Sequence, residues 1–405
     1  MEAASGLSLD LSIASKAFGD FMKIVKEHGF VRIIPLLTID NIVATSILAK
    51  MFMENDVAVS ISLKPVVDKD DPTIVIDIPF DNNVCGGYCF EILYNGGLKD
   101  VEVKNGNILL TPHSISATIV KIIEDYWILS GNEKVICLLG GINRGKDLSR
   151  EGFVKLEKAI VEELSKSNKI FYDVVGFRLW GWKRRKLYEI LTYTITPFIP
   201  GLTGKKEIAI EFVKKLGFED PDKVHSSDLV AKEDVLKNFA TELIKTANEK
   251  SKKRRSPLEF ISRIYFLSRG ADFIDLMELY GAVLTAFSKG GDYLINNFLI
   301  AQDSTLIDRL LIFYEKHIDA ISSDVANAID GLYEDTNNRV VVEPSIVSRP
   351  EVFEMVLSEI GLVDDTKYVV VNTGGKYYTS LLSLIKTKKK IDYESFNEEQ
   401  LLYIE

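Results

Sequence analysis

The stretch DNIVATSILAKMFMENDVAVSISLKP (residues 40–65) joins a helix to a strand, and this alternation decides the fold class. Residues 40–55 have apolar side chains at helical spacing, whereas residues 57–65 alternate as a strand does. TIVIDIP (73–79) is a short apolar run rich in β-branched residues, which predicts a buried strand. Strands separated by helices predict an α/β fold, with a mainly parallel sheet covered by helices on both faces.

The pattern continues along the first half of the chain. HSISATIVKIIEDYWILSG (113–131) predicts a helix that stops at Gly131, and KVICLLGG (134–141) predicts another buried strand. EGFVKLEKAIVEELSKSN (151–168) predicts an amphipathic helix. From about residue 206 to 256 the pattern is helical throughout.

The second half predicts a smaller α/β domain. Helices are expected in SPLEFISRIYFLSR (256–269), DFIDLMELYGAVLTAFSKG (272–290), TLIDRLLIFYEKHIDAISSDVANAID (305–330) and PEVFEMVLSEIG (350–361). NRVVVEPSI (338–346) and KYVVVNTGG (367–375) predict strands. We therefore expect a sheet domain at 1–205, a helical connector at 206–258 and a C-terminal domain at 259–405.

Composition bounds the possible functions. The 405 residues are 46% hydrophobic and 27% charged, as in ordinary soluble proteins, and the net charge of −10 argues against a general coat for duplex DNA. No apolar run approaches the ~20 residues of a membrane span, and the N-terminus lacks a secretory pattern. We expect a cytoplasmic protein without a membrane partner. Cys85 and Cys89 have no second Cys/His pair nearby, so we expect structural cysteines, not zinc ligands.

A glycine-rich segment, VICLLGGINRGKD (135–147), has the G-x-x-x-x-G-K spacing of a phosphate-binding loop at Gly140, Gly145 and Lys146. That motif requires Ser or Thr after the lysine to hold magnesium, and this chain has Asp147. The motif should also open a helix, whereas GKDLSREG is typical of a loop. The sequence therefore disfavours nucleotide binding here.

Several short motifs together resemble the DHH phosphoesterase family. LLTIDNIVATSILA (36–49) is similar to its D-x-D-G motif, with Thr38 and Asp40 at the aspartates and Asn41 at the glycine. IVIDIPF (74–80) is similar to the second motif, a strand that ends in Asp77. In FEILYNGG (90–97) the D-H-H positions hold Tyr94, Asn95 and Gly96, and Arg144 takes the place of a metal-binding aspartate after the Gly-rich turn.

A longer run narrows the resemblance to the archaeal RecJ-like branch that associates with GINS. GFRLWGWKRRKLYEILTYTITPFIPGLTG (176–204) is similar to the G-x-x-R-x-L…P-x-x-P-G-L-T-G run of that branch, and residues 270–299 resemble the start of its DHH-associated domain. The family ends with a G-G-G-H loop. Gly374 and Gly375 come too early and lack the histidine, so we expect a hairpin turn there.

The resemblance implies the fold of a metal-dependent enzyme in which most of the metal-binding residues have been replaced. DHH enzymes use two divalent metals to activate water and neutralise charge on a phosphodiester. Only Asp40 and Asp77 remain, and Arg144 would place a fixed positive charge in the pocket, where it could pair with either carboxylate. We therefore expect vestigial positions at these residues, with no catalytic residue, no metal and no cofactor.

A RecJ-like protein without metals implies a non-catalytic replication factor, similar to the cell-division-control protein forty-five family. The resemblance implies a scaffold that joins GINS and the MCM ring in the replicative helicase. Two alternatives stay open: a single-strand exonuclease with unusual metal ligands, and a free-standing single-strand DNA-binding protein.

The best nucleic-acid candidate is the basic and aromatic segment RLWGWKRR (178–185). Phosphates would contact Arg178, Lys183, Arg184 and Arg185, and bases would stack on Trp180 and Trp182. The same alternation could equally mark an edge strand with one solvated face. A second basic run, SKKRRSP (251–257), is better explained as a solvated helix end before Pro257.

Overall fold

The computed structural model describes residues 4–80, 88–269, 272–290, 304–335, 337–388 and 390–404, so Cys85 lies outside the described residues. The N-terminal part is a six-stranded sheet of order β2-β1-β3-β4-β6-β5, in which β5 is antiparallel and the other pairings are parallel. Its strands are β1 (Phe30–Pro35), β2 (Ala58–Ile61), β3 (Thr73–Ile76), β4 (Cys89–Tyr94), β5 (Glu102–Lys104) and β6 (Ile108–Thr111). The predicted α/β class with a mainly parallel sheet is confirmed.

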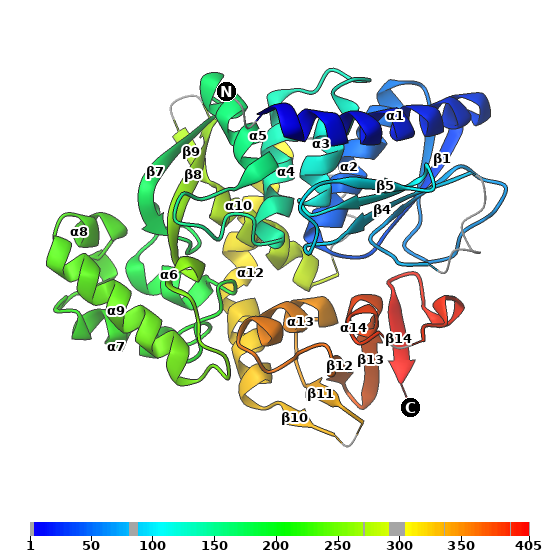
Figure 1. Cartoon of the computed structure of the whole chain (residues 1–405). Helices are drawn as coiled ribbons and strands as arrows, with labels where there is room; N and C mark the ends of the chain where they lie inside the picture. The colour runs from blue at the N-terminus through cyan, green and yellow to red at the C-terminus, as the bar shows by residue number, and fades with distance from the viewer. Residues whose placement is uncertain are drawn as a thin grey trace.

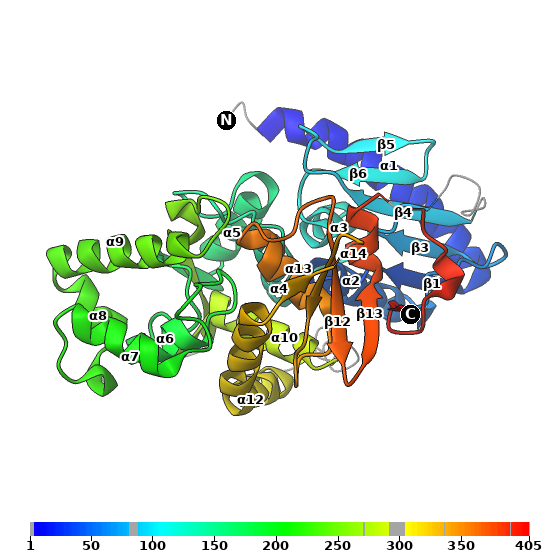
Figure 2. The same cartoon turned by 90° about the horizontal axis from the view of Figure 1, so that it is seen from below.

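Each face of this sheet is buried against different elements (Figures 1 and 2). Ile33, Ile74 and Phe90 belong to the core that the N-terminal helices share. The alternating residues Ile34 and Val75 point the other way, into a cluster completed by the C-terminal part of the chain. The helices of this part are α1 (Ala4–His28), α2 (Ile39–Glu54), α3 (Ile115–Ile123), α4 (Gly131–Asn143) and α5 (Lys155–Lys166).

Helix α4 replaces the strand predicted at 134–141, and that prediction is wrong. The segment packs against α2, α3 and α5, so Val135 to Ile142 are buried on every side. A short helix that is apolar all round has the same sequence pattern as a buried strand. Gly131, predicted to end the preceding helix, instead begins α4 after the N-cap Ser130.

A three-stranded antiparallel sheet follows, made of β7 (Ile170–Phe177), β8 (Ile261–Arg269) and β9 (Asp272–Asp275). The prediction of a helix at 256–269 is therefore wrong, because most of this segment forms β8. Successive residues of β8 enter two different cores, Ile264 and Phe266 on one side and Tyr265 and Leu267 on the other. Because both faces are buried, the strand shows no polar alternation.

Between β7 and β8 lies a helical excursion, as predicted from about residue 206. It contains α6 (Leu187–Tyr193), α7 (Lys206–Lys215), η1 (Pro221–Lys223), α8 (Ser226–Val230), α9 (Glu233–Glu249) and η2 (Pro257–Glu259). Its core is built around Trp182, Phe239 and Leu243. This cluster includes Phe177 of β7 and Phe266 of β8, which anchor the helices to the three-stranded sheet.

The C-terminal part contains a second sheet of order β10-β11-β12-β13-β14. Its elements are α10 (Leu276–Ser288), α12 (Ser304–Asp330), β10 (Tyr333–Glu334), β11 (Arg339–Val342), α13 (Pro350–Glu359), β12 (Tyr368–Thr373), β13 (Lys376–Ser380), α14 (Leu381–Lys386), η3 (Tyr393–Ser395) and β14 (Leu401–Ile404). Gly374 and Gly375 form the predicted hairpin turn between β12 and β13, with φ of +59° and +83°. Within the described ranges, no helix is both long and apolar enough to cross a bilayer.

Candidate functional site

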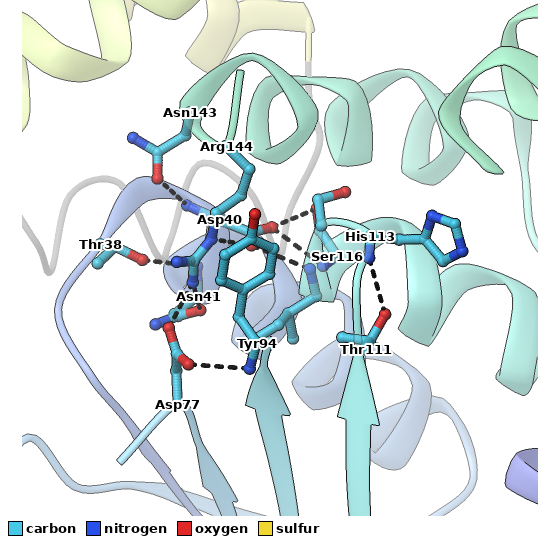
Figure 3. Close-up of polar contacts among 12 residues, drawn as sticks. Thr38, Asp40, Asn41, Asp77, Tyr94, Thr111, His113, Ser116, Asn143 and Arg144 are labelled. Atoms are coloured by element: carbon cyan, nitrogen blue, oxygen red, sulfur yellow. Dashed lines mark hydrogen bonds and ion pairs between the residues drawn. The ribbon is translucent and has the colours of Figure 1, made fainter. Parts of the chain in front are cut away.

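Asp40, Asp77 and Arg144, together called the vestigial cluster, meet at the carboxyl ends of the parallel strands (Figure 3). Asp40 lies in the first turn of α2, whose N-cap Thr38 accepts a hydrogen bond from the Asn41 amide. Asp77 directly follows β3 with φ of +62°, a backbone conformation that is uncommon outside glycine. Arg144 is the C-cap of α4. Parallel strands thus bring together residues that are far apart in sequence.

Asp40 is completely buried, and both of its carboxylate oxygens are engaged. Oδ1 accepts hydrogen bonds from the Ser116 amide at 3.0 Å and the Ser116 hydroxyl at 2.7 Å. Oδ2 accepts from the Ile115 amide at 2.9 Å and from Nε of Arg144 at 2.9 Å. The two amides belong to the N-terminal turn of α3, where the helix dipole favours a carboxylate.

Arg144 joins the two aspartates, which confirms the ion pair expected from the sequence. Its Nη2 contacts Oδ2 of Asp77 at 2.5 Å and donates to Oδ1 of Asn41 at 3.2 Å. The guanidinium carbon lies 4.4 Å from the ring centroid of Tyr94. Burial acts to lower the pKa of Arg144, but the charges of Asp77 and Asp40 outweigh it and raise that pKa. The side chain is therefore a permanent cation.

The glycines of the segment 135–147 allow close packing at this cluster and end helix α4 beside it. A β-carbon on Gly140 would lie 2.1 Å from the Ser116 hydroxyl, so only glycine lets α4 approach this closely. Gly145 has φ of +65° and donates to the Ile142 carbonyl, while the Lys146 amide donates to the Gly141 carbonyl, a common way to end a helix. The segment ends a helix, and the partial negative charge there suits Arg144 and disfavours a phosphate.

The residues present do not fit the two-metal centre of the DHH family. Arg144 occupies the space between the two aspartates, and Asp40 has no oxygen left uncommitted. At the D-H-H positions, Tyr94 stacks on Arg144, and Asn95 and Gly96 are exposed. Across the described ranges, no group of three or more His, Cys, Asp or Glu side chains is placed to hold a metal ion.

Most of the nucleic-acid candidates at 178–185 are interior residues in this structure. Trp180 is 0% and Trp182 2% exposed, so neither presents a ring face for a base. Arg178 pairs with Asp147 at 2.6 Å, and Arg185 pairs with Glu278 and Glu315. The segment is a turn and not the alternative edge strand, and only Lys183 and Arg184 are exposed.

The second basic run, 251–257, is only partly solvated. Arg255 is 1% exposed and pairs with Glu259 and Glu359, so it is a core ion pair, against the expectation of a solvated helix end. The aromatic ring of Phe260 lies 5.0 Å from its guanidinium carbon. Helix α9 ends at Glu249, before this run, and Lys252 to Arg254 are exposed.

Two residues in contact with the cluster, Ser116 and Asn143, were not singled out from the sequence. Ser116 binds Asp40, and Asn143 accepts from the Asp40 amide at 3.3 Å and donates to the Tyr280 hydroxyl at 3.1 Å. Tyr94 covers Arg144 and also accepts a hydrogen bond from Lys146. The signal available for Ser116 was its place just after the helix N-cap Ser114.

Two cavities flank Arg144 and Asn143. One of about 510 Å³ reaches Tyr280, Met355 and the loop at Thr196, and one of about 280 Å³ reaches Leu37 and α14. Helix α13 contributes to both cavities, so the vestigial cluster lies at the junction of the N- and C-terminal sheets.

Comparisons with known proteins concern the fold and the family of this chain. The structure of Cdc45 from Entamoeba histolytica matches with a TM-score of 0.59 at 12% identity, over 92% of this chain and 89% of that chain, which shows a shared fold. Exonuclease RecJ bound to manganese matches with a TM-score of 0.43 at 10% identity, over 90% of this chain and 81% of that one. RecJ with Mn²⁺ from Thermus thermophilus gives 0.40 at 11% identity, over 90% and 47%.

No curated protein is similar enough in sequence to count as a relative. Residues 121–393, more than half of the chain, match the archaeal Cdc45 family. This range includes Arg144 and the three-stranded sheet that links the two larger ones. The chain belongs to the archaeal Cdc45 family.

Proposed function

We propose that this protein is a non-catalytic replication factor that acts in the cytoplasm as a scaffold between GINS and the MCM ring of the replicative helicase. Membership of the archaeal Cdc45 family supports a role in replication. The observation that carries the non-catalytic part is the Arg144 bridge between Asp40 and Asp77.

The bridge opposes phosphodiester hydrolysis for two physical reasons. Metal-assisted hydrolysis needs carboxylates with free oxygens facing the metals, and both oxygens of Asp40 are held by the protein. Any divalent cation bound between the two aspartates would also lie beside the guanidinium of Arg144, and the two positive charges would repel each other. The vestigial cluster therefore stabilises the junction of the fold and has no role in cleaving a nucleic acid.

Two measurements test the proposal separately. We expect no degradation of labelled single-stranded DNA or RNA in manganese or magnesium, with a metal-loaded RecJ enzyme as the positive control. Robust cleavage that is lost in the double variant Asp40→Ala, Asp77→Ala would establish the exonuclease alternative instead.

The scaffold part is tested by size-exclusion chromatography with purified GINS and MCM at micromolar concentrations. We expect a ternary complex that elutes earlier than any pair. Separate elution of all components, together with tight binding of single-stranded DNA, would favour the free-standing DNA-binding alternative.

A further inference from the structure

A small pocket lies away from the vestigial cluster, between helix α5 and the strands β7 and β8, which stand side by side in Figure 1. It has a volume of about 210 Å³. Phe153 and Tyr265 are among its apolar walls, and Ser165, Lys166 and Arg263 are among its polar ones. None of these residues takes part in the Arg144 cluster.

The polar walls of the pocket carry hydrogen-bonding atoms that the protein does not use. Nε of Arg263 and the hydroxyl of Ser165 are buried, and neither has a hydrogen-bond partner among the residues that the structure describes. Within the described ranges, neither Arg263 nor Lys166 forms a salt bridge. Arg144, Arg178 and Arg255 are instead each held by carboxylates. Because unpaired buried donors are costly, this arrangement points to a ligand that supplies acceptor atoms.

Charge and size narrow the ligand class. Lys158 is paired with Glu151 at 3.4 Å. Among the described residues that line the pocket, Glu162 is the one remaining acidic side chain beside Lys166 and Arg263. The pocket is therefore slightly positive and suits an anion. Its volume is below the roughly 300–1,000 Å³ of sites that enclose a whole small molecule. A phosphate group with a few attached atoms matches this size and the planar donor fork of arginine.

An aromatic platform adjoins the donors. Tyr172 is 40% exposed, and the guanidinium carbon of Arg263 lies 4.3 Å from its ring centroid. Bases of single strands stack on tyrosine rings and on arginine planes. A β-carbon on Gly152 would lie 2.0 Å from the Tyr265 hydroxyl and 2.9 Å from Cβ of Arg263, so glycine is needed where the loop packs against these side chains.

We propose that this pocket binds one backbone phosphate of a single-stranded nucleic acid, held by Arg263, Lys166 and Ser165, with the neighbouring base stacked on Tyr172. The choice of nucleic acid over other phosphate carriers rests on the proposed role in replication and on the exposed aromatic ring. The donors and the pocket stand independently of that role.

The test measures fluorescence anisotropy of labelled oligo-thymidylate with the full-length protein and variants. We expect Arg263→Met and Tyr172→Ala each to weaken binding by on the order of tenfold, and Lys166→Met by a smaller factor. Loss of one phosphate contact should also reduce the slope of log affinity against log salt by about 1. Arg263→Lys should recover part of the affinity because it keeps the charge without the planar fork.

Arg184→Met is the matched control, because Arg184 is an exposed arginine of the rival segment 178–185. The proposal is overturned if Arg184→Met weakens binding while Arg263→Met does not, or if no variant changes the affinity. It is also overturned if a phosphoserine peptide binds more tightly than the oligonucleotide, or if polyglutamate competes as well as inorganic phosphate. Thermal melts of each variant check that the fold is kept. GINS co-elution is a separate readout, so failure of the scaffold proposal and failure of this pocket are distinguishable.

Discussion

Gly140 and Asp40 pack so closely that a β-carbon on Gly140 would lie 2.3 Å from Oδ1 of Asp40. The same carbon would lie 2.1 Å from the Ser116 hydroxyl, which itself donates to that oxygen. Helices α2, α3 and α4 thus meet at one carboxylate. Because Gly140 has no side chain, it allows α4 to approach this hydrogen-bonded carboxylate.

Gly140→Ala should therefore destabilise the protein, although alanine normally stabilises a helix interior by up to about 1 kcal/mol relative to glycine. The new methyl group must displace the Asp40 carboxylate or the Ser116 hydroxyl, and overpacking of this kind costs about 1–3 kcal/mol. Urea denaturation measures the change. Gly331→Ala is the control, because a β-carbon there meets nothing closer than 3.5 Å. Equal midpoints for both variants would contradict the contact.

Arg144→Asp should destabilise the fold more than Arg144→Ala. The aspartate adds a third negative charge beside Asp40 and Asp77, and removal of one partner of a buried ion pair costs about 3 kcal/mol. Asp40 is 0% and the Arg144 side chain 15% exposed, so solvent screens the cluster only weakly. Thermal melts with and without manganese provide the measurement. A variant that melts like the wild type, or a wild-type midpoint that rises substantially with ATP, would refute this account of the glycine-rich segment.

The sequence predicted the parallel sheet from its alternation of helices and strands, and it predicted the pairing of Arg144 with the aspartates from the resemblance of its short motifs to the DHH family. It did not predict α4 or β8, since both are buried on two or more sides and show no polar period. Trp180 illustrates a different limit. A basic and aromatic segment is compatible with a DNA surface and with a core, and only tertiary packing shows that the indole is buried against Gly281.

The sequence also did not predict contacts between segments that are far apart in the chain. Gln400 is completely buried, and its side chain accepts from the Leu37 amide at 3.0 Å and donates to the Pro35 carbonyl at 2.6 Å. These bonds tie the C-terminal segment to the end of β1, where the vestigial cluster begins.

Gln400→Ala should thus destabilise the protein by about 2 kcal/mol, because it leaves a buried amide and a buried carbonyl unpaired. Gln400→Glu should cost at least as much, since an ionised carboxylate cannot donate to the Pro35 carbonyl. Glu399→Ala is the matched control, because the Glu399 side chain is exposed. Urea denaturation of the three variants is the measurement. If Gln400→Ala and Glu399→Ala unfold at the same urea midpoint, the two hydrogen bonds of the Gln400 side chain do not contribute to stability.

His113 gives a prediction for pH. Burial, with Lys155 and Lys146 nearby, lowers the pKa of His113 from 6.5 to about 4, and the residue is 2% exposed. The unfolded chain therefore binds a proton between these two values that the folded chain does not bind, so stability falls as the pH drops from 6.5 to 4. The loss from this group is about 3 kcal/mol, and it is complete below the folded pKa. Above pH 6.5 the group makes no difference.

The check is the free energy of unfolding measured across this pH range for the wild type and His113→Gln. Glutamine does not titrate, so the variant should show a shallower fall in stability than the wild type between pH 6.5 and 4. His28→Gln is the control, since His28 is an exposed histidine. If the unfolding free energy of the variant has the same slope against pH as that of the wild type, His113 is protonated in the folded protein. The interpretation of His113 as a buried neutral imidazole would then be wrong.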